Sequence, residues 1–213
     1  MTEKNDSANT HALILQQARA LFLSQGYHNT TMRTIAEAAG ISTGPLYFHF
    51  RNKAEVFFHI CSEAYDYLIA DFQRAAGQEG RAALRLRSIY YAYKAFYYRE
   101  PQLFEMIHFA TNPIGGVDLP QPLQQALHSK SQQMVQIMEE IIREGVSRHE
   151  LRAVDPGKLA LYLYSAAEGI FLAQRMGVLE RAQVSLDAMI DSAVELIGLG
   201  MLESRFSKNP NEG

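Results

Sequence analysis

The chain has 213 residues, of which 47% are hydrophobic and 20% charged, and this composition excludes a disordered, collagen-like or low-complexity chain. A single cysteine, Cys61, excludes an intrachain disulfide and a four-cysteine zinc site. The net charge of −3 excludes a uniformly basic nucleic-acid coat, but residues 1–53 hold five cations and three anions against 15 and 20 in the remainder. This asymmetry favours a nucleic-acid-binding segment joined to an acidic body.

The first ten residues contain no apolar segment of the kind that a secretory signal needs. No stretch reaches the roughly 18 consecutive apolar residues of a membrane span. A single thiol is typical of a reducing compartment. We therefore expect a cytoplasmic protein without a membrane partner.

The beginning of the chain predicts a polar tail followed by a helix. Residues 1–9 are polar, and we expect them to be disordered. From Thr10 onward the apolar residues recur at the spacing of one helical face, and Gly26 predicts the end of this helix. The residues of that face are Ile14, Ala18, Leu21 and Phe22.

Two short helices are predicted next. Thr30 or Thr31 can cap the first of them, and Gly40 ends it. Ser42 can cap the second, with Pro45 in the first turn, where the missing N–H is not needed.

The rest of the chain predicts longer helices and no strand. The run SIYYAYKAFYY could be a strand by propensity, but it has no internal turn residue and its tyrosines repeat at three and four positions, so we interpret it as a helix. Together the segments predict an all-α fold of nine helices, followed by a flexible tail over residues 204–213. The six longer helices are expected at about residues 52–76, 81–99, 101–110, 123–147, 156–176 and 185–203.

The spacing of three residues predicts a helix–turn–helix. Ala36 is followed by Gly40 four positions on and by Leu46 six further. Two short helices that cross steeply need a small residue where the backbones touch, glycine in the tight turn and an aliphatic residue to close the core. The exposed start of the second helix, residues 42–47, could then enter a DNA major groove. A helical hairpin without a ligand is the alternative.

A family resemblance rests on matched positions at fixed spacing. The segment over residues 12–60 resembles the DNA-binding domain of the tetracycline-repressor (TetR) family. The matched residues are Ala18, Leu21, Phe22, Gly26, Thr31, Arg33, Ile35, Ala36, Ala39, Gly40, Ser42, Gly44, Leu46, Tyr47, His49, Phe50 and Lys53.

The resemblance implies a homodimeric transcriptional regulator, usually a repressor that a small molecule releases from DNA. It implies a TetR-like architecture, with a helix–turn–helix DNA-binding domain over residues 10–53 and a helical effector-binding and dimerisation domain over residues 54–203. Two linked heads would bind the halves of a pseudo-palindromic operator.

Roles at the DNA follow for individual residues. Gly44 would let the backbone come close to the bases, where its neighbours make methyl and van der Waals contacts. Arg33 can reach a base edge or a phosphate, and the resemblance implies that Lys53 pairs with a phosphate. Phe48 and Phe50 are expected in the core. The predicted DNA-binding residues are Thr31, Arg33, Ser42, Thr43, Gly44, Pro45, Tyr47, His49 and Lys53.

The last two long helices are apolar on several faces, so both sides must be covered. Pairing with the same helices of a second chain would cover them, and burial within one chain is the alternative. The predicted dimer-interface residues are Ala166, Ile170, Ala173, Ile190, Ala193, Val194 and Ile197.

The middle helices supply candidates for an effector pocket with apolar walls and a few polar groups. Such walls favour an aromatic or lipophilic effector, which would shift the population of operator-binding states. Ordinary core packing is the alternative. The candidate pocket residues are Tyr93, Tyr97, Phe104, His108, Met134, Met138, Tyr164 and Glu168.

The sequence contains no glycine-rich phosphate loop, no G-x-S-x-G and no H-E-x-x-H motif. Its seven histidines are scattered. We therefore expect no catalytic residues, no metal and no cofactor. Two alternatives to an effector-released repressor remain open: an effector-independent global or architectural DNA-binding protein, and an activator.

Overall fold

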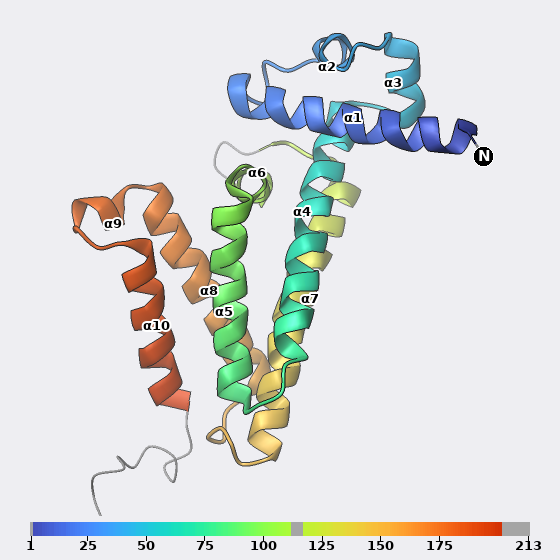
Figure 1. Ribbon diagram of the computed structural model, residues 1–213. Helices are drawn as coiled ribbons and strands as arrows, with labels where there is room; N and C mark the ends of the chain where they lie inside the picture. The colour runs from blue at the N-terminus through green and yellow to red at the C-terminus, as the bar shows by residue number, and fades with distance from the viewer. Residues whose placement is uncertain (1, 112–116, 202–213) are drawn as a thin grey trace, which may run out of the picture. The chain divides into compact units, whose positions relative to one another are not determined.

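The computed structural model describes residues 2–111 and 117–201, and in these ranges every regular element is a helix (Figure 1). The all-α class is therefore confirmed. The described residues form ten helices instead of nine, because the four-residue helix α9 (Val178–Arg181) lies between the last two long ones. None of these helices is both long and apolar enough to cross a membrane. The predicted tail over residues 204–213 lies outside the described residues.

The chain divides into two compact units, Met1–Tyr67 with Arg99–Lys130 and Leu68–Tyr98 with Ser131–Gly213. The start of the helix after residue 53 packs inside the first unit: the rings of Phe57 and Phe109 lie 6.5 Å apart, and the Cys61 thiol lies 3.7 Å from the Met106 carbonyl oxygen. The expected domain boundary after residue 53 stays a prediction.

The first unit contains four complete helices and the first parts of two longer ones. Its elements are α1 (Thr2–Gln25), α2 (Met32–Ala38), α3 (Thr43–His49), the start of α4 (Lys53–Ala76), α6 (Pro101–Thr111) and the start of α7 (Gln121–Ser147). Helix α1 packs against α2 (Figure 1). The side chains buried between these helices are apolar, as predicted, and include Ile14, Ala18, Phe22, Ile35, Ala36, Leu46, Phe50, Val56, Phe57 and Ile60.

The expected disordered tail over residues 1–9 is not what the structure shows, because α1 begins at Thr2. The segment contains neither glycine nor proline, so nothing in it breaks the helix.

The second unit is built from the rest of α4 and α7, most of α5 (Ala82–Arg99), α8 (Pro156–Arg175), α9 and α10 (Leu186–Met201). As predicted, the Asp155 carboxylate caps α8 by accepting from the backbone N–H of Lys158 at 2.9 Å. Helices α5 and α7 approach closely at Gly145, where a Cβ atom would lie 2.5 Å from that of Ala82. The buried residues of this unit include Phe72, Leu86, Ile89, Tyr93, Phe96, Met134, Met138, Ile141, Leu163 and Phe171.

Candidate DNA-binding surface

The start of α2 is fixed by a capping box. The Thr31 hydroxyl accepts from the backbone N–H of Thr34 at 3.1 Å, and the Thr34 hydroxyl accepts from the backbone N–H of Thr31 at 3.0 Å. Two helix-terminal donors are thereby satisfied. Thr31 is therefore the cap of α2, one of the two roles predicted for it. Its other predicted role, a contact with DNA, stays a prediction.

The turn between α2 and α3 has the geometry that the sequence spacing predicts. Gly40 adopts φ +66°, a left-handed conformation that favours glycine, and the Ile41 N–H donates to the Ala36 carbonyl at 3.0 Å. Ala36 and Leu46 are both buried beside the turn. This local core holds α3 at a fixed angle to α2.

Helix α3 presents its N-terminal half to solvent. The residues from Ser42 to Pro45 are exposed, and Ser42 makes no side-chain cap hydrogen bond. Tyr47 is 54% exposed. A Cβ atom built on Gly44 would meet nothing within 4 Å. Internal packing therefore does not require glycine at this position.

The two phenylalanines of this segment lie in opposite environments. Phe50 is buried, as expected, but Phe48 is 83% exposed, so the expectation of a core position is wrong for Phe48. The cause is helical geometry: Leu46 and Phe50 are four residues apart and share the buried face, whereas Phe48 lies on the other side of the helix. Phe48 thus adds an aromatic ring to the exposed surface.

Arg33 lies on the exposed side of α2. Its side chain is 83% exposed, and its Nε donates to Glu37 Oε1 at 2.9 Å, one helical turn on. This hydrogen bond and the charge of Glu37 raise the pKa of Arg33. Exposed ion pairs of this kind contribute little stability. Arg33 can therefore exchange Glu37 for another acceptor, such as a phosphate or a base edge.

Lys53 has contacts that its predicted phosphate role did not anticipate. Its Nζ donates to the carbonyl oxygens of Tyr27 at 2.6 Å and Thr30 at 2.7 Å, and lies 4.2 Å from the centre of the Tyr27 ring. Burial lowers the pKa of Lys53. Lys53 therefore ties the start of α4 to the loop that joins α1 and α2. The phosphate contact stays a prediction.

His49, the last residue of α3, belongs to a group of rings that the sequence analysis missed. The His11 ring of α1 lies 5.7 Å from both His49 and His59, and 4.8 Å from Phe50. Burial lowers the pKa of His11, and His59 and His49 lower it further. The three histidines are far apart in sequence, so no local pattern could have revealed the group.

The predicted pocket residues divide between the two units. Phe104 and His108 belong to the first unit, where their rings stack 4.1 Å apart. The other six belong to the second unit. Three of them, Tyr93, Met138 and Tyr164, line a small internal cavity of about 10 Å³. The Tyr93 hydroxyl donates to Glu168, and the Tyr97 ring packs against Phe171. Met134 is buried.

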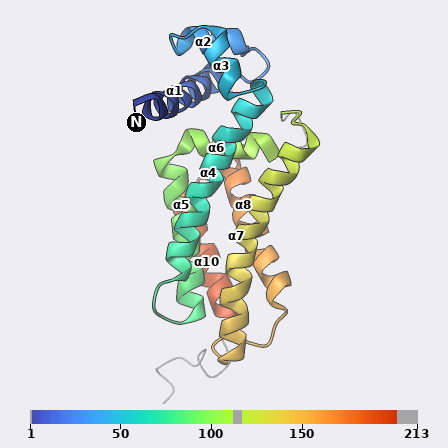
Figure 2. The same cartoon turned by 90° about the vertical axis from the view of Figure 1, so that its right-hand side faces the viewer.

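The predicted dimer residues are less exposed than their neighbours. Ile170 and Ile190 are buried within the second unit, and Ala166, Ala173, Ala193, Val194 and Ile197 are partly exposed. Helices α8 and α10 pack against each other (Figures 1 and 2). Their exposed apolar side chains, here called the apolar stripe, are Leu161, Tyr162 and Leu172 on α8, Met176 at the C-cap of α8, and Met189 and Leu196 on α10.

The sequence analysis did not select the residues of the apolar stripe. The helical period could have revealed part of it, because Leu161, Leu172 and Met176 recur at intervals that return to one face. Among the described residues, no group of three or more His, Cys, Asp or Glu side chains could hold a metal ion.

The fold and the exposed start of α3 define a helix–turn–helix protein. Residues 14–60 match the family of bacterial regulatory proteins described as the tetR family. The chain is 42% identical to the transcriptional regulator TtgR of Pseudomonas putida over 53 residues, 25% of each chain. It is 27% identical to the repressor KstR2 of Mycolicibacterium smegmatis over 140 residues, 65% of this chain and 66% of that one.

The chain therefore spans between a quarter and two thirds of the length of these relatives. A solved structure, the complex of SmeT with triclosan, has the same fold with a TM-score of 0.74 and 19% identity, covering 96% of this chain and 100% of that one. Residues 14–60 are therefore similar to the tetR family of bacterial regulatory proteins, and the described chain has the same fold as the SmeT structure.

Proposed function

We propose that the protein is a homodimeric repressor that binds a pseudo-palindromic operator through α3 and leaves it when a small lipophilic or aromatic effector binds. The main observation that supports DNA binding is the exposed position of Gly44 in the first turn of α3. Glycine in a helix costs about 0.5–1 kcal/mol relative to alanine. Apart from its two neighbours and the adjacent backbone of its own helix, no atom of the described residues lies within 4 Å of a Cβ built at Gly44. A glycine that the fold does not need is explained by the close approach of another molecule.

The surroundings of Gly44 fit a DNA groove. Thr43 and Pro45 are exposed beside it, and the Tyr47 ring follows one turn later. Arg33 on α2 supplies a charged group that is held only by an exposed ion pair. Helix–turn–helix proteins read bases through the start of the second helix and bind phosphates through the flanking residues.

The experiment selects bound duplexes from a random DNA pool and then compares the wild type with Gly44→Ala. We expect a pseudo-palindromic sequence to be selected. The variant should unfold at the same or a higher temperature, because alanine favours the helix, but bind the selected DNA at least about tenfold more weakly. Lys158→Ala, an exposed change in the second unit, is the control and should bind as the wild type does. Equal binding by Gly44→Ala would contradict the proposed role of α3.

The apolar stripe supports the homodimer. Tyr162 is 61% exposed, Met176 63% and Leu196 70%, and these side chains come from two adjacent helices. Extended exposed apolar surface is a mark of an interaction site. A second copy is the occupant that a twofold-symmetric arrangement supplies, since the same stripe then covers itself.

The effector site is proposed around the internal cavity of the second unit. At about 10 Å³ this cavity holds no effector, so binding must displace the side chains around it. Met138 can adapt its shape, and the Tyr93 hydroxyl with Glu168 supplies the polar contact. The SmeT structure shows a protein of the same fold bound to a small molecule, triclosan.

The small size of this cavity also favours a second candidate, a DNA-binding regulator that needs no effector. A panel of lipophilic compounds separates the two functions by the release of the selected DNA. For an effector-released repressor, we expect at least one compound to weaken DNA binding and Tyr93→Phe to change its potency. If no compound that binds the protein tightly alters its affinity for DNA, the effector-independent function is correct.

A further inference from the structure

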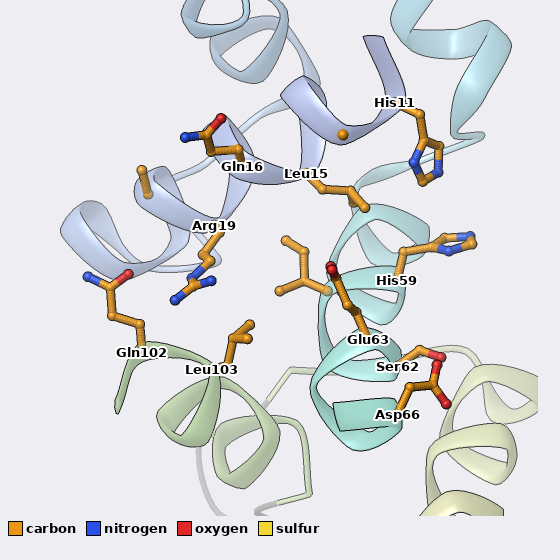
Figure 3. A pocket seen from close by; sticks show the side chains of 13 residues that line it. His11, Leu15, Gln16, Arg19, His59, Ser62, Glu63, Asp66, Gln102 and Leu103 are labelled. Atoms are coloured by element: carbon orange, nitrogen blue, oxygen red, sulfur yellow. The ribbon is translucent and has the colours of Figure 1, made fainter. Parts of the chain in front are cut away.

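A second cavity, of about 680 Å³, lies entirely in the first unit, between α1, α4 and α6 (Figure 3). Its size is within the range of small-molecule sites, which is about 300–1,000 Å³. It shares no residue with the internal cavity of the second unit. We refer to it as the α1–α4–α6 cleft.

The cleft combines an apolar floor with polar walls. Leu15, Ile60 and Leu103 come from the three helices and supply the apolar surface. In Figure 3 the Arg19 guanidinium lies on one side, and Glu63 and the two rings of His11 and His59 lie on the other. A ligand of this cleft must therefore carry both a lipophilic part and a polar group.

Most of the charges around the cleft already have partners of opposite sign. Arg19 Nη2 pairs with Glu100 Oε2 at 3.0 Å, and Lys130 Nζ pairs with Asp66 Oδ1. Each pair is neutral as a whole, so neither wall attracts a charged ligand strongly.

Glu63 is different. Its Oε1 accepts a hydrogen bond from the neutral Tyr67 hydroxyl at 2.8 Å, and among the described residues it forms no ion pair. Glu63 raises the pKa of His11 across the cleft, but burial, His59 and His49 lower it. The cleft therefore has one uncompensated negative charge beside an apolar floor.

We propose that the α1–α4–α6 cleft binds an organic amine in its protonated form, with the ammonium group against Glu63 and a lipophilic part over Leu15, Ile60 and Leu103. The cleft shares no lining residue with the cavity of the proposed effector site, and amine binding can be measured without DNA. The assignment therefore does not depend on the proposed function.

The test uses three probes with one scaffold and different charges: 4-phenylbutylamine, 4-phenylbutanol and 4-phenylbutyrate. Isothermal titration calorimetry on the full chain at pH 7.5 should show binding of the amine. The alcohol should bind at least about tenfold more weakly, and the carboxylate should not bind measurably. Equal or tighter binding of the carboxylate would overturn the proposal, as would the absence of amine binding.

Two variants locate the bound amine. Glu63→Gln keeps the shape of the side chain and removes the charge, so amine binding should weaken at least about tenfold. Tyr67→Phe removes the hydrogen bond to the same carboxylate but keeps the charge, so it should bind the amine as well as the wild type. Unchanged binding by Glu63→Gln would place the amine elsewhere and refute the assignment. Far-UV circular dichroism and thermal unfolding of the same preparations show that both variants are folded, without recourse to DNA binding.

Discussion

At the scale of single residues, two cations of the first unit lie in opposite environments. Arg33 projects into solvent with one exposed ion pair, whereas the Lys53 ammonium is held by backbone carbonyls of the loop before α2. Both were predicted to contact DNA from their positions in the sequence. Their surroundings predict different consequences when each is removed.

Replacing Lys53 by methionine should destabilise the protein. The change leaves the carbonyl groups of Tyr27 and Thr30 without their donor. A hydrogen bond to a charged group contributes about 1.5–3 kcal/mol to stability. We expect the free energy of unfolding, measured by urea titration with circular dichroism, to fall by about 1–3 kcal/mol.

Arg33→Ala is the matched comparison. Because its side chain is exposed, the free energy of unfolding should stay close to that of the wild type, while binding to the selected DNA weakens. A Lys53→Met variant as stable as the wild type would contradict the structural role of Lys53.

At the scale of elements, α1, α3 and α4 meet at three histidine rings. His11 faces His49 from α3, and His59 and Glu63 from α4. The pKa of His11 is lowered by burial first and by the other two histidines next, and Glu63 opposes them. The packing of these helices is therefore coupled to protonation.

The sign of the pH effect follows from this shift. Above the ordinary histidine pKa of about 6.5, His11 is neutral in both the folded and the unfolded chain. As the pH falls below that value, the unfolded chain takes up the proton first, so the folded state loses stability until the pH passes below the folded pKa. We therefore expect the urea concentration at the unfolding midpoint to be lower at pH 5.5 than at pH 7.5.

The variant His11→Gln should show a smaller fall of the urea midpoint over the same pH range. His28→Gln is the control, since His28 is an exposed loop residue. If His11→Gln and the wild type lose stability equally on acidification, the coupling through His11 is absent.

At the scale of the whole molecule, the proposed homodimer depends on the apolar stripe of α8 and α10. The stripe is exposed in a single chain, so a charged substitution there costs little folding free energy. In a homodimer the same charge would be buried against its own copy, where it is strongly unfavourable.

We expect Leu172→Glu to convert the dimer to folded monomers in sedimentation velocity. The affinity for the selected DNA should fall by about 100-fold or more, because two linked heads bind with a high effective concentration. The control is Leu84→Glu on α5, which is also an exposed leucine but lies outside the stripe. A Leu172→Glu variant that sediments as the wild type does would refute the proposed interface.

The sequence alone determined the all-α class and the helix–turn–helix. Ala36, Gly40 and Leu46 lie within eleven residues, and the caps at Thr31 and Asp155 are local as well. Residues close together in the chain determine this short-range geometry, so it can be deduced from their spacing.

Only the tertiary structure decided which side of each element is covered. The exposure of Phe48, the carbonyl contacts of Lys53 and the grouping of His11 with His49 all depend on partners or faces that three-dimensional packing selects. The same holds for the apolar stripe and the uncompensated charge of Glu63. Burial and electrostatic environment arise from contacts between residues far apart in the chain, and a helical period identifies a face without identifying what covers it.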